Sequence, residues 1–327
     1  MNELPDPHAP LENPQAVFGL ILSGRVEDAE IARFLVGLAE RGETVEEIEG
    51  AARALRQRMV AVEAPPGAVD VCGTGGDGAH TRNISTAVAI VLASCGVPVA
   101  KHGNRAASSK SGAADVLSEL GLNLDLEPQR VEASINEIGI GFLFAARHHP
   151  VMARVAPVRR ALGRRTIFNL LGPLANPAGV DRQLVGVYDE RWTRPLAEAL
   201  QRLGAVHALT VHGDGGLDEL ALSGPSIGAE LAGGKIEDRR MTPEDAGLQR
   251  HALEAIRGGT PAENAAALIA LLEGRKDAYR DIVILNTAAA LTVAGRAESL
   301  ADGAHLAQIA LDDGASRQKL EDWRQFA

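Results

Sequence analysis

The sequence predicts an α/β protein with a small all-helical domain and a larger α/β domain, which holds a central, mainly parallel sheet flanked by helices. Residues 1–66 show helical periodicity and no strand pattern, and they end in Pro65-Pro66. Over residues 67–327, short β-branched runs alternate with helical segments. This alternation is typical of a parallel sheet with helices on its faces.

The N-terminal domain is expected to contain three helices. The first is Pro14–Leu22, and the second, Val26–Arg41, places apolar residues at the spacing of one helix face. Thr44 begins the run T-V-E-E, a capping box with Glu47 three residues later. We expect this third helix to run to about Val62, before the proline pair.

The larger domain begins with strands and helices in turn. The expected strands are Ala68–Cys72, Val97–Ala100, Ile140–Phe144, Leu184–Tyr188 and Ala208–His212. The helices between them are Ile84–Cys95, Gly112–Leu120, Pro128–Ile138 and Arg191–Leu203. A glycine follows several of these helices, where a C-terminal glycine is common.

Residues 150–177 interrupt the alternation. They predict a helix broken at a proline, followed by a short helix and a turn. Further on, Ile227–Ile236 resembles a hairpin around Gly233-Gly234. The remaining chain is expected to be helical, over Pro261–Leu272, Asp277–Ala294, Ser299–Asp312 and Ser316–Gln325.

Charge and composition limit the function. The net charge is −10, and no block of five or more basic residues occurs, so neither nucleic acid nor an anionic membrane is an expected partner. Aromatic residues make up 3% of the chain, which leaves little for stacking bases. The N-terminus lacks a signal-peptide pattern and no apolar run reaches the ~20 residues of a membrane span, so we expect a cytoplasmic protein.

Cys72 and Cys95 are the only cysteines. Their spacing matches no zinc site, and two cysteines in a long chain make no disulfide framework. We expect both to be small buried side chains.

Two loops rich in glycine and polar residues follow neighbouring strands, at Gly73–Thr86 and Lys101–Gly112. The first reads G-T-G-G-D and leads into N-I-S-T, which opens a helix. Glycines allow close backbone approach, and a helix N-terminus stabilises a phosphate. The spacing fits neither a Walker loop nor a dinucleotide fingerprint. The second loop reads K-H-G-N-R, so both loops are expected at the carboxyl edge of the sheet, where such folds bind ligands.

Asp218 and Glu219 form an adjacent acidic pair in H-G-D-G-G-L-D-E-L. Hard oxygen ligands that leave room for water and phosphate suit Mg²⁺. Neighbours on a regular strand face opposite sides, so the pair holds one ion only from an irregular turn, or else faces two ions. A solvated turn is the alternative for the dipeptide alone.

Two other pairs have open interpretations. His148-His149 suggests a structural or substrate-lining role, because adjacent histidines rarely converge on one ion. Arg159-Arg160 is either a solvated helix face or a source of one guanidinium for a substrate carboxylate. The sequence shows no Ser-His-Asp or Cys-His signature, which fits chemistry without a protein nucleophile.

Taken together, the motifs resemble the anthranilate phosphoribosyltransferase family of tryptophan biosynthesis, in order and over nearly the whole chain. They are G-T-G-G-D, N-I-S-T, K-H-G-N-R, H-H-P, V-R-R-x-L-G-x-R-T-I-F-N-L-L-G-P-L-x-N-P and G-L-D-E. The resemblance implies transfer of phosphoribosyl from 5-phosphoribosyl-1-pyrophosphate to the anthranilate amine, with release of pyrophosphate. It also implies two Mg²⁺ ions per subunit, and a homodimer formed through the helical domain, which helices from about 150–180 complete.

The resemblance assigns site residues by motif. For the phosphoribosyl donor they are Gly73, Gly76, Asp77, Thr81, Asn83, Ile84, Ser85, Thr86, Lys101, His102, Gly103, Asn104, Arg105, Ala106, Ala107, Ser108, Ser109 and Ala113. For anthranilate they are Gly73, Asn104 and Arg159. For magnesium they are Ser85, Asp218 and Glu219, and the catalytic residues are Lys101, Asp218 and Glu219.

The chain departs from the family pattern at Ala113, where many members have a serine that contacts the donor. Ala146 and Ala153 replace a frequent proline and a frequent lysine. Two other functions remain as alternatives. A pyrimidine nucleoside phosphorylase would need a lysine-methionine-serine run, which is missing. A non-catalytic nucleic-acid-binding relative should be basic, whereas this chain is acidic.

Overall fold

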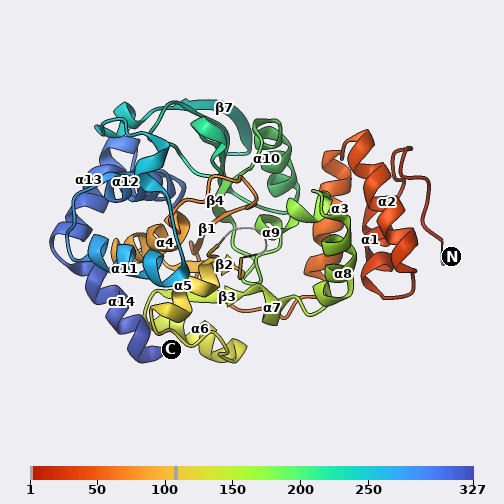
Figure 1. The fold of residues 1–327 in the computed structure, drawn as a ribbon, viewed down its shortest axis with the longest axis horizontal. Coiled ribbons are helices and arrows are strands. Elements are labelled where there is room, and N and C mark those ends of the chain that lie inside the picture. Colours follow the sequence, from red (N-terminus) through yellow and green to blue (C-terminus); the bar gives the residue numbers. More distant parts are fainter. Residues whose placement is uncertain (1–2, 107–109) are drawn as a thin grey trace.

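A seven-stranded sheet forms the centre of the molecule in the computed structural model, which describes residues 3–106 and 110–327. The strand order is β3-β2-β1-β4-β5-β6-β7, and the sheet is parallel from β3 to β5 (Figure 1). The strands are β1 Val69–Gly73, β2 Val99–Gly103, β3 Ile140–Phe144, β4 Arg182–Gly186, β5 His207–His212, β6 Ser226–Ala232 and β7 Lys235–Met241. The prediction of a mainly parallel sheet in an α/β protein is confirmed.

β1 and β5 differ from the expected bounds by a single residue at an end, whereas β2 and β4 are displaced by two residues or more. β2 was expected to end at Ala100 but continues to Gly103, because Lys101, His102 and Gly103 pair in parallel with β3. β4 was expected to start at Leu184, but it begins at Arg182, which is paired with β5.

The N-terminal helices are α1 Pro14–Leu22, α2 Asp28–Arg41 and α3 Val45–Arg56. The predicted capping box is present, because Thr44 accepts from the Glu47 amide and the Glu47 side chain accepts from the Thr44 amide. The prediction that α3 runs to about Val62 is wrong. Beyond Arg56 the chain bonds to distant segments instead, with the Val62 amide donating to Pro177.

Residues 150–177 return to the N-terminal helices, where α8 Met152–Leu162 packs beside α1 and α2 (Figure 1). The expected break at a proline does not occur, because α8 continues through Pro157. Proline removes one hydrogen bond of a helix. Val155 and Val158, on either side of it, are buried against the helical bundle and hold this segment in place.

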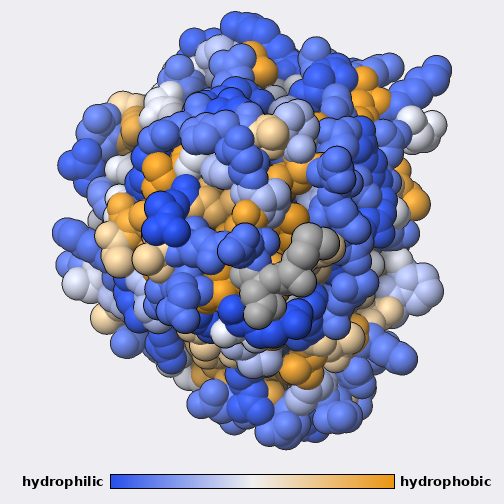
Figure 2. Space-filling view, turned by 90° about the vertical axis from the view of Figure 1, so that its right-hand side faces the viewer, coloured by the Kyte–Doolittle hydropathy of each residue, from blue (hydrophilic) through white to orange (hydrophobic). Residues whose placement is uncertain are grey.

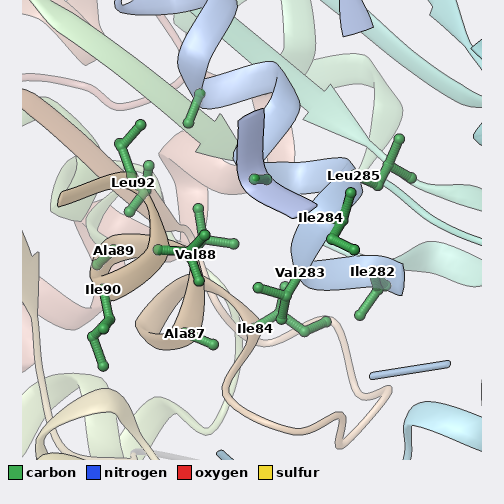
Figure 3. Close-up of a cluster of buried hydrophobic side chains, with 14 of the residues drawn as sticks. Ile84, Ala87, Val88, Ala89, Ile90, Leu92, Ile282, Val283, Ile284 and Leu285 are labelled. Carbon is green, nitrogen blue, oxygen red and sulfur yellow. The ribbon is translucent and has the colours of Figure 1, made fainter. Parts of the chain in front are cut away.

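The other helices cover the two faces of the sheet. They are α4 Ile84–Ser94, α5 Ala113–Glu119, α6 Pro128–Glu137, α7 Ala145–His148, α9 Leu171–Leu174, α10 Thr193–Arg202, α11 Pro261–Leu272, α12 Ala278–Val293, α13 Leu300–Asp312 and α14 Ala315–Phe326. α4 is apolar on all sides because it lies between the sheet and α12. Figure 3 shows Ile84 of α4 beside Val283 of α12 in this core.

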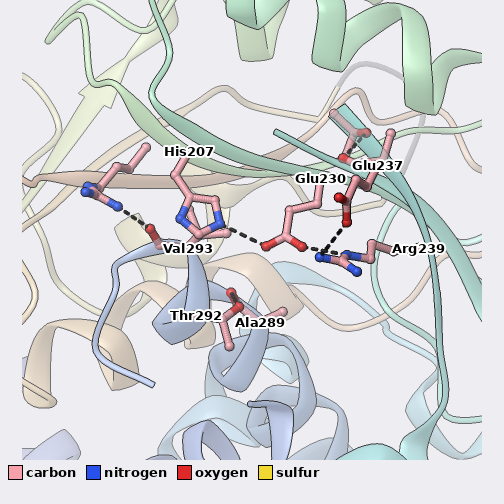
Figure 4. A network of polar contacts seen from close by, with 10 residues as sticks. His207, Glu230, Glu237, Arg239, Ala289, Thr292 and Val293 are labelled. Atoms are coloured by element: carbon pink, nitrogen blue, oxygen red, sulfur yellow. Dashed lines mark hydrogen bonds and ion pairs between the residues drawn. The ribbon is translucent and has the colours of Figure 1, made fainter. Parts of the chain in front are cut away.

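The antiparallel hairpin β6–β7 extends the sheet beyond β5, as the glycine pair predicted. A network of polar side chains connects β5, β6 and β7 (Figure 4). The His207 ring contacts Glu230 at 2.9 Å, and Arg239 donates to the other Glu230 oxygen at 2.6 Å. The bond to His207 and the bond to Arg239 lower the pKa of Glu230. The network therefore fixes the register of the hairpin against β5.

Cys72 and Cys95 are free but half-buried, so the prediction of two buried side chains is wrong. Burial raises the pKa of the Cys72 thiol well above its usual value and that of Cys95 to about 11. Within the described ranges, no helix has the length and hydrophobicity needed to cross a membrane.

Candidate active site

The site lies at the carboxyl edge of the sheet, where β1, β2 and β4 end next to one another. Gly73 and Gly186 end two of these strands, and both contact the acidic segment that follows β5. A Cβ atom at either position would overlap with Asp218. These two glycines therefore let a segment from over a hundred residues downstream approach the first loop.

The first loop is held by three separate parts of the chain. The Gly75 amide donates to Asp218 Oδ2 at 2.7 Å, and the Tyr188 amide donates to Thr74 Oγ1 at 3.0 Å. Arg165 donates to the Gly76 carbonyl, and its guanidinium lies 4.0 Å from the centre of the Tyr188 ring. Gly75 and Gly76 adopt positive φ angles of 68° and 75°, which glycine tolerates best.

The loop leads into the N-terminus of α4, where the predicted donor residues Asn83, Ile84, Ser85 and Thr86 lie together. Asn83 is the N-cap residue, but its side chain does not cap the helix. Thr86 is buried, and its hydroxyl has no hydrogen-bond partner in the described structure. The first turn of a helix carries unpaired N–H groups and a partial positive charge, both suited to a phosphate.

Thr81, also predicted to contact the donor, pairs through its backbone with Arg257 in an isolated bridge. Asp77 lies in the loop, and its side chain accepts from the Ala79 amide at 3.2 Å.

Lys101 differs from its prediction, because it lies within β2 and not in a loop. Its side chain is 1% exposed, and Nζ donates to the Val71 carbonyl at 2.7 Å and to Ser85 Oγ at 3.1 Å. The ammonium group is thus directed beneath the start of α4. It is also close enough to Glu219 to stabilise the charged form of that carboxylate.

His102 and Gly103 are strand residues as well. The His102 amide donates to the buried carboxylate of Asp70 at 3.0 Å, and its ring contacts the Gly172 carbonyl at 3.1 Å. Burial lowers the pKa of His102 to about 3, and that of His149, whose ring lies 5.1 Å away, to about 4. Both rings are therefore neutral at physiological pH. A direct charge interaction between His102 and a phosphate does not fit this state.

The histidine pair lies at the end of α7, where His148 is the last helical residue. His148 contacts the Val60 carbonyl at 2.7 Å, and both His148 and His149 are buried. Burial is compatible with a structural role, and both ring nitrogens of His149 lack a hydrogen-bond partner in the described structure.

The second loop begins at Asn104, which is exposed like Arg105. Asp115 holds both ends of the loop, since it accepts from the amides of Ala106 and Gly112, each at 2.9 Å. These bonds and the Arg105 guanidinium outweigh partial burial and lower the pKa of Asp115. Ala113 begins α5, next to Gly103. Three predicted donor residues, Ala107, Ser108 and Ser109, lie outside the described residues.

The acidic pair faces the first loop from an irregular turn after β5. Burial, and then repulsion by Asp77, raises the pKa of Asp218 to about 7. Burial and Asp218 raise the pKa of Glu219 well above its usual value. Asn286 holds the next residue, Leu220, through bonds of 2.9 Å to its amide and 3.0 Å to its carbonyl. The carboxylates of Asp77, Asp218 and Glu219 thus lie close together, and the Lys101 ammonium group stabilises the charged form of Glu219.

A group of three or more His, Cys, Asp or Glu side chains arranged for one metal ion does not occur among the described residues. The carboxylates nevertheless suit Mg²⁺, which binds through one or two carboxylates together with water and phosphate oxygens. Burial, together with the neighbouring carboxylates, raises the pKa of Asp218 and of Glu219, so a bound cation would stabilise the charged form of both.

Arg159 lies on α8, away from both loops in the sequence. Its guanidinium is half-buried and makes no hydrogen bond or ion pair with another described residue. It lies 5.8 Å from the centre of the Phe168 ring, and burial lowers its pKa. It remains charged, because an arginine stays protonated at neutral pH. Arg160, its neighbour, is exposed.

Several residues that shape this site were not predicted from the sequence: Asp70, Asp115, Arg165, Asn264 and Asn286. Asp70 offered a signal, as a carboxylate between two valines of a buried strand. Asn286 stands in an otherwise apolar helix. Asp70 and Asn286 bond to segments far away in the chain, so their unusual positions in the sequence could not have revealed which residues they hold.

Two family models match the chain. The glycosyl transferase family α/β domain covers residues 65–317, and the helical bundle domain of the same family covers residues 12–59. An anthranilate phosphoribosyltransferase from Novosphingobium aromaticivorans is 57% identical over 325 residues, which is 99% of this chain and 98% of that protein. One from Parvibaculum lavamentivorans is 56% identical over 306 residues, covering 94% and 90% of the two chains.

Solved structures give the same family. The anthranilate phosphoribosyltransferase from Thermus thermophilus has a TM-score of 0.93 at 45% identity, covering 98% of this chain and 96% of its own. The enzyme from Saccharomyces cerevisiae, in complex with PRPP and Mg, has a TM-score of 0.87 at 27% identity, covering 96% and 92%. The nucleoside phosphorylase and nucleic-acid-binding alternatives gain no support. With close relatives matched over almost its full length, this chain belongs to the anthranilate phosphoribosyltransferases.

Proposed function

We propose that this protein transfers the phosphoribosyl group of 5-phosphoribosyl-1-pyrophosphate to the amine of anthranilate, releasing pyrophosphate, the second step of tryptophan biosynthesis from chorismate. One observation carries the proposal beyond family membership. The glycine loop, the start of α4, Lys101 and the acidic pair meet at one edge of the sheet. Together they offer amides and a cation to phosphates, and carboxylates to a metal ion.

The donor is expected to bind along the two loops, through the predicted residues from Gly73 to Thr86 and from Lys101 to Ala113. Amides of the first loop and of α4 would receive its phosphates. Lys101 is proposed to act through Ser85 and through its charge, because its ammonium group is buried beneath the helix. Ala113 offers no hydroxyl, so we expect no side-chain bond to the donor there.

Magnesium is proposed to bind at Ser85, Asp218 and Glu219, with two ions per subunit. The relative from Saccharomyces cerevisiae was solved with PRPP and Mg. Bound magnesium would neutralise the charge that develops on the pyrophosphate leaving group. The adjacent carboxylates face the first loop from a turn, which allows them to serve one ion or two.

Anthranilate is proposed to lie between the loops and α8, near Gly73, Asn104 and Arg159. A half-buried guanidinium without a protein partner is suited to a substrate carboxylate. The relative from Saccharomyces cerevisiae was also solved in complex with 4-fluoroanthranilate.

The chemistry requires positioning more than a reactive side chain. Cleavage at C1 of the ribose develops positive charge on the sugar and negative charge on the leaving group. Lys101 and the loop amides stabilise the negative charge. The site holds the arylamine against C1, which supplies proximity. An arylamine is neutral at physiological pH, so a strong general base is not needed.

The direct test follows the fluorescence of anthranilate in a mixture of protein, Mg²⁺ and phosphoribosyl pyrophosphate. We expect a loss of signal that depends on the donor, and its absence would contradict the proposed function. The double substitution Asp218→Asn and Glu219→Gln is expected to abolish Mg²⁺-dependent turnover. Full activity in this variant would place the metal elsewhere.

We also propose that the chain divides into a helical domain, 1–66 joined by helices from about 150–180, and an α/β domain, 67–327. A homodimer through the helical domain would cover half-buried apolar residues such as Val17, Leu20 and Val45. Figure 2 views the molecule from the side on which α1–α3 and α8 lie in Figure 1, and it shows apolar areas among hydrophilic ones. Light scattering after size exclusion tests the dimer.

We also propose that the protein is cytoplasmic, because its proposed substrates, phosphoribosyl pyrophosphate and anthranilate, are small molecules.

A further inference from the structure

Asn264 connects the two ligand loops from a distant part of the chain. It lies at the start of α11 and is 3% exposed. Its Nδ2 donates to Asn83 Oδ1 at 2.8 Å, and its Oδ1 accepts from the Gly259 amide at 2.8 Å. The same Asn83 oxygen accepts from Ser111 Oγ, at the end of the second loop, at 3.1 Å. One amide oxygen therefore joins the first loop, the second loop and α11.

The segment before Asn264 follows the first loop closely. The Gly258 amide donates to the His80 carbonyl at 2.8 Å, and the Arg82 amide donates to the Ile256 carbonyl at 3.0 Å. Asn264 is thus placed against the loop by backbone bonds that do not depend on its own side chain.

These contacts explain an unusual feature of α4. Asparagine is among the best N-cap residues, because its side-chain oxygen accepts from the first-turn amides. Asn83 occupies the N-cap position of α4 but makes no such bond. Its oxygen is engaged by Asn264 and Ser111 instead. The first turn of α4 therefore receives no cap from Asn83, and the side chain that reaches it, at the Ser85 amide, is the Glu219 carboxylate.

We propose that Asn264 is a positioning residue for donor binding, which keeps the Asn83 side chain away from the α4 amides so that a phosphate can reach them. The inference rests on the proposed function, because it concerns the same donor site. Without Asn264, the Asn83 oxygen can turn to the first-turn amides and compete with the phosphate for them.

The test compares Asn264→Ala with Thr260→Ala. Thr260 caps the same helix, α11, by accepting from the Glu263 amide, but it contacts neither loop. For Asn264→Ala we expect KM for phosphoribosyl pyrophosphate to rise about tenfold, equal to about 1.4 kcal/mol, with KM for anthranilate changed less than about twofold. Thr260→Ala should leave both constants near those of the parent. Asn264→Leu, similar in size, gives the same comparison if the alanine variant does not fold.

A double variant separates positioning from general destabilisation. In the Asn83→Ala background the side chain at position 83 cannot cap α4, so Asn264→Ala should change KM for the donor by less than about twofold. A tenfold rise in that background as well, or an equal rise in Thr260→Ala, would overturn the inference. If the parent protein itself consumes no anthranilate, the proposed function fails, and this result is distinct from either of those.

Discussion

Arg159 is a charged side chain whose surroundings leave it available to a ligand. It is half-buried and unpaired within the described structure, and its neighbour Arg160 is exposed. At the proposed anthranilate site, replacement by alanine would remove a charge-assisted bond to the substrate carboxylate, a bond worth about 1.5–3 kcal/mol. We therefore expect Arg159→Ala to raise KM for anthranilate about 10- to 100-fold. Steady-state kinetics with varied anthranilate measures this.

Arg160→Ala is the matched control, because it removes the same charge from an exposed position of the same helix. It should leave KM for anthranilate near that of the parent. Arg159→Lys keeps the charge but not the planar fork, so we expect an intermediate KM. An unchanged KM in Arg159→Ala would refute the assignment.

Asp218 is expected to reduce stability in the metal-free protein. Its folded-state pKa is raised to about 7 from 3.8 by burial and by Asp77. Between those two pH values the folded state keeps a proton that the unfolded state has released, so stability falls as pH rises. Above about pH 7 this loss of folding stability has reached its full size. Below pH 3.8, the ordinary pKa of the group, Asp218 causes no loss of stability.

Asp218→Asn should therefore raise the Tm of the metal-free protein at pH 8, by about 2 °C or more, while it impairs Mg²⁺-dependent turnover. The gain should shrink as the pH is lowered towards 4. Thermal unfolding in the presence of a chelator, at several pH values, measures it. A variant no more stable than the parent at pH 8 would contradict the charge argument.

The sequence predicted which residue types gather at the site, but not how they are held. Lys101 was expected in a loop, yet it lies buried in β2 and reaches Ser85 from below. The role of Asn264 could not be predicted, because its partner Asn83 lies 181 positions away in the chain. Such contacts depend on tertiary packing, which local pattern does not encode.

At the scale of secondary structure elements, the ends of β1 and β4 determine where the acidic pair can lie. A Cβ at position 186 would overlap with the backbone of Asp218, which cannot move away as a flexible side chain would. We expect Gly186→Ala to lower the free energy of unfolding by about 1–3 kcal/mol. Displacement of the acidic pair should also raise the Mg²⁺ concentration needed for half-maximal activity.

Gly172→Ala in α9 is the control, since an added Cβ there meets no other atom within 4 Å. Chemical denaturation and a magnesium titration compare the two variants. If Gly186→Ala behaves like Gly172→Ala in both measurements, close approach at the strand end is not important for the proposed magnesium site.

Elements were predicted well where local signals were strong. α1 and α11 have the bounds predicted from the sequence, and the glycine pair located the hairpin. The errors arose where tertiary contacts decided the outcome. α3 ends at Arg56 because the chain beyond it bonds to distant segments, and α8 continues through Pro157 because its flanking valines are buried.

At the scale of the whole molecule, one sheet supports two large hydrophobic clusters. The first packs α4, α5 and the C-terminal helices against one face, and the second joins α1–α3 and α8 to the other. Neighbouring residues of a strand contribute to opposite clusters, as Leu184 does to the first and Val185 to the second. The helical bundle is therefore not packed as a separate body, since its core continues onto the sheet.

This arrangement predicts that both clusters unfold together, although larger proteins often unfold in steps. Each cluster contains one of the two tryptophans, Trp323 in the first and Trp192 in the second. In Trp192→Phe and Trp323→Phe, the remaining tryptophan reports on a single cluster. Within each variant we expect the midpoint from tryptophan fluorescence to coincide with the midpoint from far-UV circular dichroism. Loss of either cluster exposes one face of β4 and β5, and the sheet cannot keep the other face packed without these strands. In Trp323→Phe, a fluorescence midpoint for Trp192 that comes before the circular dichroism midpoint would instead mean that the helical bundle unfolds by itself.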